Sequence, residues 1–222
     1  MTGVRAGDRA RVAGLILAGG AGKRMGVDKA TIRTDGRSQL EHVAATLCAV
    51  FDTVLVSVRH GDQNLQIPSG LETVVDGVPD AGPLTGIVAA HRRLPDRAIF
   101  VVAVDLFGLT ESVVRAVLRA REGQGRCSVT ALAAYTGRGA SDGASPVPDP
   151  LCAIWEPDIL RTAADEFSRG LRAPFTLLKT TTVQIVPQSR SVFNINTPED
   201  LAAYAGTKQV GQEGCSARTD PS

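Results

Sequence analysis

The sequence predicts an α/β protein with a doubly wound, mostly parallel sheet that carries helices on both faces. Short apolar runs alternate with segments of helical periodicity through the first half of the chain, which indicates βαβ units. These runs are continuous, as in strands that are buried on both faces. Aromatic residues make up only 4% of the chain against 43% hydrophobic residues, so aliphatic side chains must form the core.

The first half of the chain supplies strands and helices in alternation. We expect strands at 12–17 (VAGLIL), 53–58 (TVLVSV), 71–76 (LETVVD) and 98–105 (AIFVVAVD), the last being the most hydrophobic and therefore central. Ser38 and Glu41 fit a capping box at the start of the first helix. Pro83 can open the second helix, and Thr110 can cap the third.

The second half is less regular. We expect strands at 128–134, 150–155 and 181–186, a helix from Pro157 to Gly170, and a short helix over 171–178. The segment 193–204 predicts a short extended piece and then a helix capped by Thr197, with Pro198 at its first position. The Gly/Ser/Pro-rich loop 136–150 is either an active-site cover or a disordered segment.

One domain accounts for the chain. We expect a flexible tail at 1–11, a single domain at 12–206 and a disordered tail at 207–222, because the ends are polar and aperiodic. A net charge of +1 gives no general attraction to nucleic acid or to a membrane. The four cysteines form no CxxC pair, and we see neither a signal peptide nor a membrane-spanning run, which favours the reduced cytoplasm.

The stretch LAGGAGKRMGVDKA, residues 17–30, directly follows the first strand and combines glycines with cations. Leu17 and Arg24 exclude the phosphate loop G-x-x-x-x-G-K-[ST], and the dinucleotide pattern G-x-G-x-x-G lacks its third glycine. The glycines let backbone N–H groups approach a phosphate, and Lys23, Arg24 and Lys29 can each meet a phosphate oxygen. The alternative is a turn whose cations are merely solvated.

The carboxyl ends of the predicted strands place loops 18–29, 76–86 and 105–109 on one rim of the sheet, where ligands of such folds bind. Asp105 ends the most apolar strand, where an unpaired charge would be costly. It can hold Mg²⁺, which takes one or two carboxylates plus substrate phosphates, or it can cap the helix that follows.

Five segments together resemble the signature of the molybdenum cofactor guanylyltransferase family. They are LAGG-x-x-x-RMG-x-DK at 17–29, VVDGVPDAGPLTGI at 74–87, AIFVVAVD at 98–105, PLCAIW at 150–155 and FNINTPEDL at 193–201. The resemblance covers nearly all of residues 12–204. It departs from the family's C-D-x-P after the central strand, where this chain reads VDLFGL, and loop 136–150 has no match.

The resemblance implies a Rossmann-like fold of the nucleotide-diphospho-sugar transferase kind and a Mg²⁺-dependent nucleotidyltransferase. In that family, GTP donates GMP to the terminal phosphate of molybdenum–molybdopterin, which forms the guanine dinucleotide cofactor and releases pyrophosphate. The implied partners are GTP and a molybdopterin-type cofactor, with transient contacts to cofactor-synthesis or acceptor proteins. Nucleic acid and membrane are not among them.

The resemblance also implies a set of site residues. The catalytic set is Arg24, Lys29 and Asp105, with Asp105 as the metal ligand. The nucleotide-binding set is Leu17, Ala18, Gly19, Gly20, Lys29, Asp76, Gly82 and Asp105, and a second group of candidates is Lys23, Pro83, Gly86, Asn194 and Asn196. Plainer alternatives are an ion pair of Lys29 with Asp28, turns at the glycines and at Asp76, a helix start at 82–86, and hydrogen bonding of the asparagines around Thr197.

Three other functions stay open. A CTP-dependent cytidylyltransferase shares the chemistry, although the second glycine of LAGG favours guanine by resemblance. A sugar-phosphate nucleotidyltransferase is another alternative, although such chains usually carry extra domains. A nucleotide- or cofactor-binding accessory protein is suggested by the altered VDLFGL segment, whereas the retained Lys29 and Asp105 argue against it.

Overall fold

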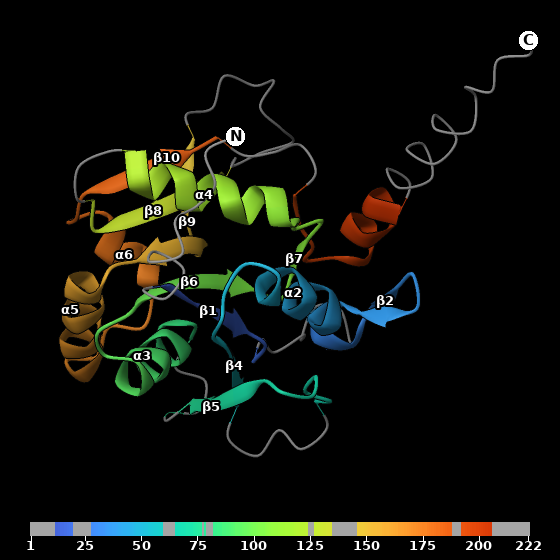
Figure 1. Ribbon diagram of the computed structural model, residues 1–222, viewed down its shortest axis with the longest axis horizontal. Coiled ribbons are helices and arrows are strands. Elements are labelled where there is room, and N and C mark those ends of the chain that lie inside the picture. The colour runs from blue at the N-terminus through green and yellow to red at the C-terminus, as the bar shows by residue number, and fades with distance from the viewer. Residues whose placement is uncertain are drawn as a thin grey trace, which may run out of the picture.

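The computed structural model describes residues 12–19, 28–59, 65–76, 78, 82–123, 127–134, 146–187 and 192–205. These residues form a seven-stranded sheet with helices on both faces (Figure 1). The strand order is β10-β8-β9-β6-β1-β4-β5, and β9 runs antiparallel to both of its neighbours while the other pairs are parallel. The predicted α/β class and mostly parallel sheet are therefore confirmed.

The sheet strands are β1 (Val12–Leu17), β4 (Val54–Arg59), β5 (Glu72–Asp76), β6 (Ala98–Ala103), β8 (Val129–Ala134), β9 (Val147–Trp155) and β10 (Val183–Val186). Two short ladders pair β2 (Arg33–Thr34) with β3 (Arg37–Ser38) and β7 (Leu106–Phe107) with β11 (Phe193–Asn194). The helices are α2 (Gln39–Cys48), α3 (Leu84–Arg93), α4 (Glu111–Gly123), α5 (Pro157–Ser168) and α6 (Pro174–Leu178), with a 3₁₀ turn η1 (Lys29–Thr31) and a last helical segment at 198–205.

Two predicted caps are confirmed by their hydrogen bonds. At α2, the Ser38 hydroxyl accepts from the backbone N–H of Glu41 at 3.2 Å, while the Glu41 carboxylate accepts from the N–H of Ser38 at 2.6 Å. At the last helix, the Thr197 hydroxyl accepts from the N–H of Asp200 at 3.2 Å. Local capping chemistry thus sets the starts of both helices.

Several predicted boundaries are wrong by a few residues. The central strand ends at Ala103, so Asp105 lies in the turn after it. Strand β9 begins at Val147, three residues before the predicted start at 150, because antiparallel pairing with Ala133 and Ala134 of β8 extends it. Residues 136–145 of the predicted loop lie outside the described residues, as do the predicted tails at 1–11 and 207–222.

Largely aliphatic cores cover both faces of the sheet, with α2 and α4 on one side and α3 and α5 on the other (Figure 1). Ile16 of β1 packs in the core that includes α2 and α4, whereas Leu15 packs in the core that includes α3 and α5. Both residues are fully buried, which is why β1 reads as a continuous apolar run. No helix in the described part of the chain is long and apolar enough to cross a membrane.

The chain changes direction across the sheet at β1. It runs from β1 to β4 and β5 on one side, and then returns to β6 on the other side of β1. Leu17 at the end of β1 lies in register with Ala103 at the end of β6. Such a switch point leaves a crevice beyond the carboxyl ends of the strands, which is where ligands of open α/β sheets bind.

Candidate active site

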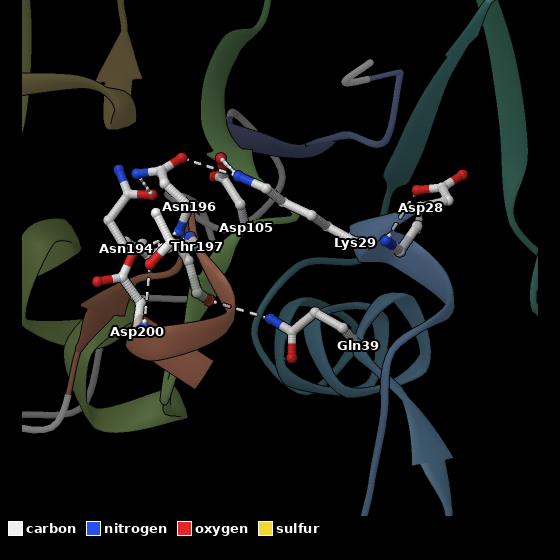
Figure 2. Close-up of polar contacts among 10 residues, drawn as sticks. Asp28, Lys29, Gln39, Asp105, Asn194, Asn196, Thr197 and Asp200 are labelled. Atoms are coloured by element: carbon white, nitrogen blue, oxygen red, sulfur yellow. Dashed lines mark hydrogen bonds and ion pairs between the residues drawn. The ribbon is translucent and has the colours of Figure 1, made fainter. Parts of the chain in front are cut away.

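Lys29 and Asp105 meet beyond the carboxyl ends of β1 and β6. The Lys29 Nζ donates to Asp105 Oδ2 at 3.1 Å and to Asn196 Oδ1 at 2.8 Å, as Figure 2 shows. The side chains of Lys29 and Asp105 are only 17% and 27% exposed. Three segments far apart in the sequence, each containing predicted site residues, therefore converge on one ammonium group.

Asp28 places Lys29 but does not pair with it. The Asp28 carboxylate caps η1 by accepting from the N–H of Ala30 at 3.0 Å, and Ala30 is buried at the start of that turn. No ion pair joins Asp28 to Lys29 within the described part of the chain. The alternative of a surface pair between these neighbours is wrong, because Asp28 is engaged in capping and Lys29 points to Asp105.

The segment after Asp105 is held by backbone hydrogen bonds. The Asp105 carbonyl accepts from the N–H of Ile195 at 3.0 Å, and the buried Gln39 side chain donates to the carbonyl of Leu106 at 3.1 Å (Figure 2). Strand β7 then pairs with β11. The VDLFGL sequence, which has no proline, therefore forms a ladder strand that fixes the backbone of Asp105.

The asparagines and Asp200 form a local network next to the Lys29 ammonium. Asn196 Nδ2 donates to Asn194 Oδ1 at 3.2 Å, and the N–H groups of Asn196 and Thr197 both donate to Asp200 Oδ2 at 2.9 Å. The backbone hydrogen bonds from Asn196 and Thr197 lower the pKa of Asp200. The predicted local hydrogen bonding is thus present, and Asn196 in addition contacts Lys29.

Asp149 is a second carboxylate near Asp105, and sequence reasoning missed it. Burial raises the pKa of Asp149, the N–H of Leu151 opposes this by donating to it at 2.8 Å, and the charge of Asp105 raises the pKa further. Strand β9 carries Asp149 antiparallel to β6, so the two carboxylates approach the same end of the sheet. No sequence motif marks Asp149, and only the antiparallel pairing reveals its place.

The oxygen donors of this site suit a hard divalent cation. Carboxylate oxygens are the ligands that Mg²⁺ prefers, usually from one or two side chains together with substrate phosphates. Asp105 is partly exposed at the rim, and Asp149 adds a second carboxylate close by. The described residues contain no group of three or more His, Cys, Asp or Glu side chains that could hold a metal ion.

Arg59 is another residue that sequence reasoning missed. It ends β4, and its Nε donates to the carbonyl of Gly19 at 2.6 Å. The N–H of Ala18 donates to the carbonyl of Ser57 at 3.1 Å on the same strand. Ala18 and Gly19, at the start of the glycine-rich segment, are therefore anchored to β4, an arrangement that the spacing of the sequence did not indicate.

The remaining predicted residues divide into three groups. Leu17, Ala18 and Gly19 lie at the end of β1 beside the Lys29–Asp105 pair, and Asp76 ends β5 on the same rim. Gly82 and Pro83 are exposed at the start of α3, whereas Gly86 lies within α3 and is buried against Ser57 and Leu17. Gly20, Lys23 and Arg24 lie outside the described residues, as does the side chain of Asp76.

Sequence comparison assigns the family. Residues 14–183 match the family described as "MobA-like NTP transferase domain", and the chain belongs to this family of nucleotidyltransferases. The chain is 30% identical over 205 residues to the molybdenum cofactor guanylyltransferase of Burkholderia lata, covering 87% of this chain and 95% of that protein. It is 28% identical over 190 residues to a molybdenum cofactor biosynthesis bifunctional protein of Synechocystis sp., and the match covers 84% of this chain and about half of that protein (52%).

Solved structures share the fold. The molybdopterin-guanine dinucleotide biosynthesis protein A of Archaeoglobus fulgidus superposes with a TM-score of 0.69 at 22% identity, covering 89% of this chain and 99% of that chain. Rv0371C of Mycobacterium tuberculosis, described as a complex with manganese, superposes with a TM-score of 0.64 at 14% identity, covering 89% of this chain and all of that chain (100%). The expected nucleotidyltransferase fold is therefore confirmed.

Proposed function

We propose that this chain transfers GMP from GTP to the terminal phosphate of a molybdenum–molybdopterin cofactor and releases pyrophosphate. The observation that carries the proposal is the pairing of Lys29 with Asp105 at the switch point of the sheet. Lys29 belongs to the first and Asp105 to the third of the five segments that resemble a guanylyltransferase signature, and Lys29 also contacts Asn196 of the last segment. Membership of the MobA-like family and the name of the Burkholderia relative support the same chemistry.

The proposed reaction is an in-line displacement at the α-phosphorus of GTP. An oxygen of the acceptor's terminal phosphate forms the new bond to phosphorus. The bond to the oxygen that bridges the α- and β-phosphates breaks, and its electron pair leaves with pyrophosphate. Such a step depends on positioning and charge neutralisation rather than on a covalent protein intermediate.

Each residue of the site has a proposed role. Lys29 neutralises the triphosphate and the leaving pyrophosphate together with Arg24 and Lys23, because charge-assisted bonds to phosphate are strong. The segment from Leu17 to Gly20 presents backbone groups to the nucleotide. Asp76 and the 82–86 turn, which includes Gly82, Pro83 and Gly86, are assigned to the nucleoside side. Asn196 orients Lys29, and Asn194 supports Asn196.

Asp105 is the proposed ligand of Mg²⁺. When bound, this ion supplies neutralisation of the charge that develops on the phosphate oxygens. The chemistry of the donor set supports the assignment, since Asp105 and Asp149 bring two carboxylates to the rim. The manganese complex of a protein with the same fold is a further, weaker support.

Thermal unfolding with GTP, CTP, ATP or UTP in the presence of Mg²⁺ tests nucleotide choice. A ligand at 100 times its dissociation constant stabilises the folded state by about 2.7 kcal/mol. We expect selective stabilisation by GTP. Stabilisation by CTP instead would indicate a cytidylyltransferase. A single-turnover assay with labelled GTP and molybdopterin tests catalysis itself. Nucleotide binding without release of pyrophosphate in that assay would indicate a binding protein.

Asp105→Asn tests the metal role. We expect this variant to keep most of its affinity for GTP and to lose at least about 100-fold in turnover, which corresponds to about 2.7 kcal/mol of transition-state stabilisation. Single-turnover release of labelled pyrophosphate at saturating Mg²⁺ measures the effect. Transfer of GMP at near the wild-type rate would show that Asp105 is not the metal ligand.

A further inference from the structure

Lys29 occupies the carboxylate that the proposed metal needs. Its ammonium lies 3.1 Å from Asp105 Oδ2, and both side chains are mostly shielded from solvent. A pair in this setting is screened less than a surface pair, and removing one partner leaves the other charge uncompensated. The ligand-free protein therefore already contains a counter-ion for Asp105.

The rest of the network holds Lys29 on this carboxylate. Asn196 Oδ1 accepts from the same ammonium at 2.8 Å, and the backbone of Asn196 is fixed by Asp200 Oδ2 at 2.9 Å. On the other side, the Asp28 cap fixes the turn that carries Lys29. Because both ends of the contact are anchored, Lys29 needs a stronger anion to draw it away from Asp105.

The charge around Asp105 favours a cation once Lys29 has left. Asp149 lies close enough for the charge of Asp105 to affect it, and it forms no ion pair within the part of the chain that the structure describes. Two neighbouring carboxylates attract a divalent cation, whereas the ammonium of Lys29 on Asp105 repels one at short range.

We propose that Lys29 is a built-in competitor of the divalent cation, so that it weakens metal binding to the free protein while it strengthens nucleotide binding. A triphosphate draws Lys29 off Asp105 and thereby opens that carboxylate to the metal. Metal and nucleotide consequently favour each other's binding, as linkage requires. This inference rests on the proposed metal role of Asp105, but not on the identity of the nucleotide base or the acceptor.

The test measures Mn²⁺ binding in the absence of nucleotide by the loss of the free-ion electron paramagnetic resonance signal. We expect Lys29→Met to bind Mn²⁺ at least tenfold more tightly than the wild-type chain, and the gain to disappear in the double variant with Asp105→Asn. Lys179→Met is the matched control, because it removes one positive charge from a lysine that contacts Phe175. It should bind Mn²⁺ as the wild type does.

A second measurement follows GTP affinity, which should fall in the variant that gains Mn²⁺ affinity. In EDTA, Lys29→Met should bind GTP at least tenfold more weakly than the wild type, as followed by calorimetry. Lys29→Gln, which keeps a donor for Asn196, should show both effects if Lys29→Met folds poorly.

Failure of the wild type to transfer GMP would contradict the proposed function but leave the Mn²⁺ measurement intact. Mn²⁺ affinity that is unchanged or lower without Lys29, or a gain that persists without Asp105, would overturn the inference.

Discussion

Arg59 and Lys29 each form a hydrogen bond that holds one part of the candidate site, the backbone of Gly19 and the carboxylate of Asp105. Arg59 fixes the carbonyl of Gly19, which is the last described residue before the cations of the glycine-rich segment. Lys29, near the end of that segment, reaches Asp105. The backbone at Gly19 and the ammonium of Lys29, both proposed to meet the nucleotide, are therefore each held by a hydrogen bond.

Arg59→Ala should weaken nucleotide binding. A hydrogen bond that involves a charged group contributes about 1.5–3 kcal/mol, so we expect the dissociation constant of GTP to rise about tenfold or more while the unfolding midpoint changes little. Isothermal titration calorimetry measures this constant. Arg97→Ala is the matched control, since Arg97 donates to the Thr53 hydroxyl at the other end of the sheet. Equal GTP affinities for wild type and Arg59→Ala would contradict the role.

Sequence reasoning found Lys29 and Asp105 because short-range patterns mark them, a glycine-rich turn for one and a strand end for the other. It missed Arg59 and Asp149 for a physical reason. Both are single polar residues in strands, and their partners, Gly19 and Asp105, lie just beyond the ends of other strands of the sheet. Nothing in their own neighbourhoods of the sequence indicates these partners.

At the scale of elements, the strands were the best-predicted parts of the fold. Continuous apolar runs identify β1, β4 and β6 because both faces of the sheet are covered. The two-residue strands β2, β3, β7 and β11 were not predicted, because two residues carry no periodicity. The early start of β9 was missed because VPDP contains prolines, which are uncommon inside strands.

Gly86 permits the close packing of α3 on the sheet. A Cβ at this position would lie 2.4 Å from Ser57 Oγ and 2.7 Å from Leu17 Cδ2. We expect Gly86→Ala to lower the free energy of unfolding by about 1–3 kcal/mol, as overpacking does, when measured by urea denaturation. Gly123→Ala at the end of α4, where a Cβ would meet nothing within 4 Å, should cause no loss. Equal stability of both variants would show that α3 can shift away freely.

His91 should make stability depend on pH. It is 6% exposed in α3, its Nδ1 has no hydrogen-bond partner in the described part of the structure, and burial lowers its pKa, as do Arg161 and Arg92, whereas Asp96 raises it. A lowered folded-state pKa means that the unfolded chain binds the proton more readily, so stability is lost as pH falls below about 6.5.

The variant His91→Leu isolates this dependence. It removes the titrating ring and the unpartnered nitrogen, so the difference in unfolding free energy between variant and wild type should grow in favour of the variant from pH 8 to pH 5.5. Urea denaturation at several pH values measures this difference. A difference that stays constant with pH would show that His91 titrates alike in the folded and unfolded states.

At the scale of the whole molecule, the C-terminal segment 193–205 completes the candidate site from outside the main sheet. It joins the site through β7, the Ile195 N–H and the Asn196 side chain. The resemblance predicted that Asn194 and Asn196 belong to the site. The contact of Asn196 with Lys29 could not be predicted, because it depends on how this segment returns across the ends of β1 and β6. A separate small cluster of Phe107, Ile195 and Tyr204 holds it there.

Tyr204 is the anchor of that cluster. It is 8% exposed and packs edge-to-face on Phe107, with ring centroids 5.5 Å apart, and on Phe193, with centroids 5.6 Å apart. Truncating a buried aromatic side chain costs about 3–5 kcal/mol in a main core. Because this cluster is separate from the two main cores, the loss should fall on the local opening of 193–205 rather than on global unfolding.

Tyr204→Ala should therefore destabilise the C-terminal segment of the site without destabilising the sheet. We expect backbone amides in 194–205 to exchange hydrogen at least tenfold faster, while those of β1 and β6 keep their protection, as measured by mass spectrometry. GMP transfer should fall as well, since Asn196 would no longer hold Lys29 in place. Phe175→Ala, which truncates a 39% exposed aromatic residue on α6, should leave the exchange of 194–205 unchanged. Faster exchange throughout the sheet would show instead that the C-terminal segment and the main domain unfold as one unit.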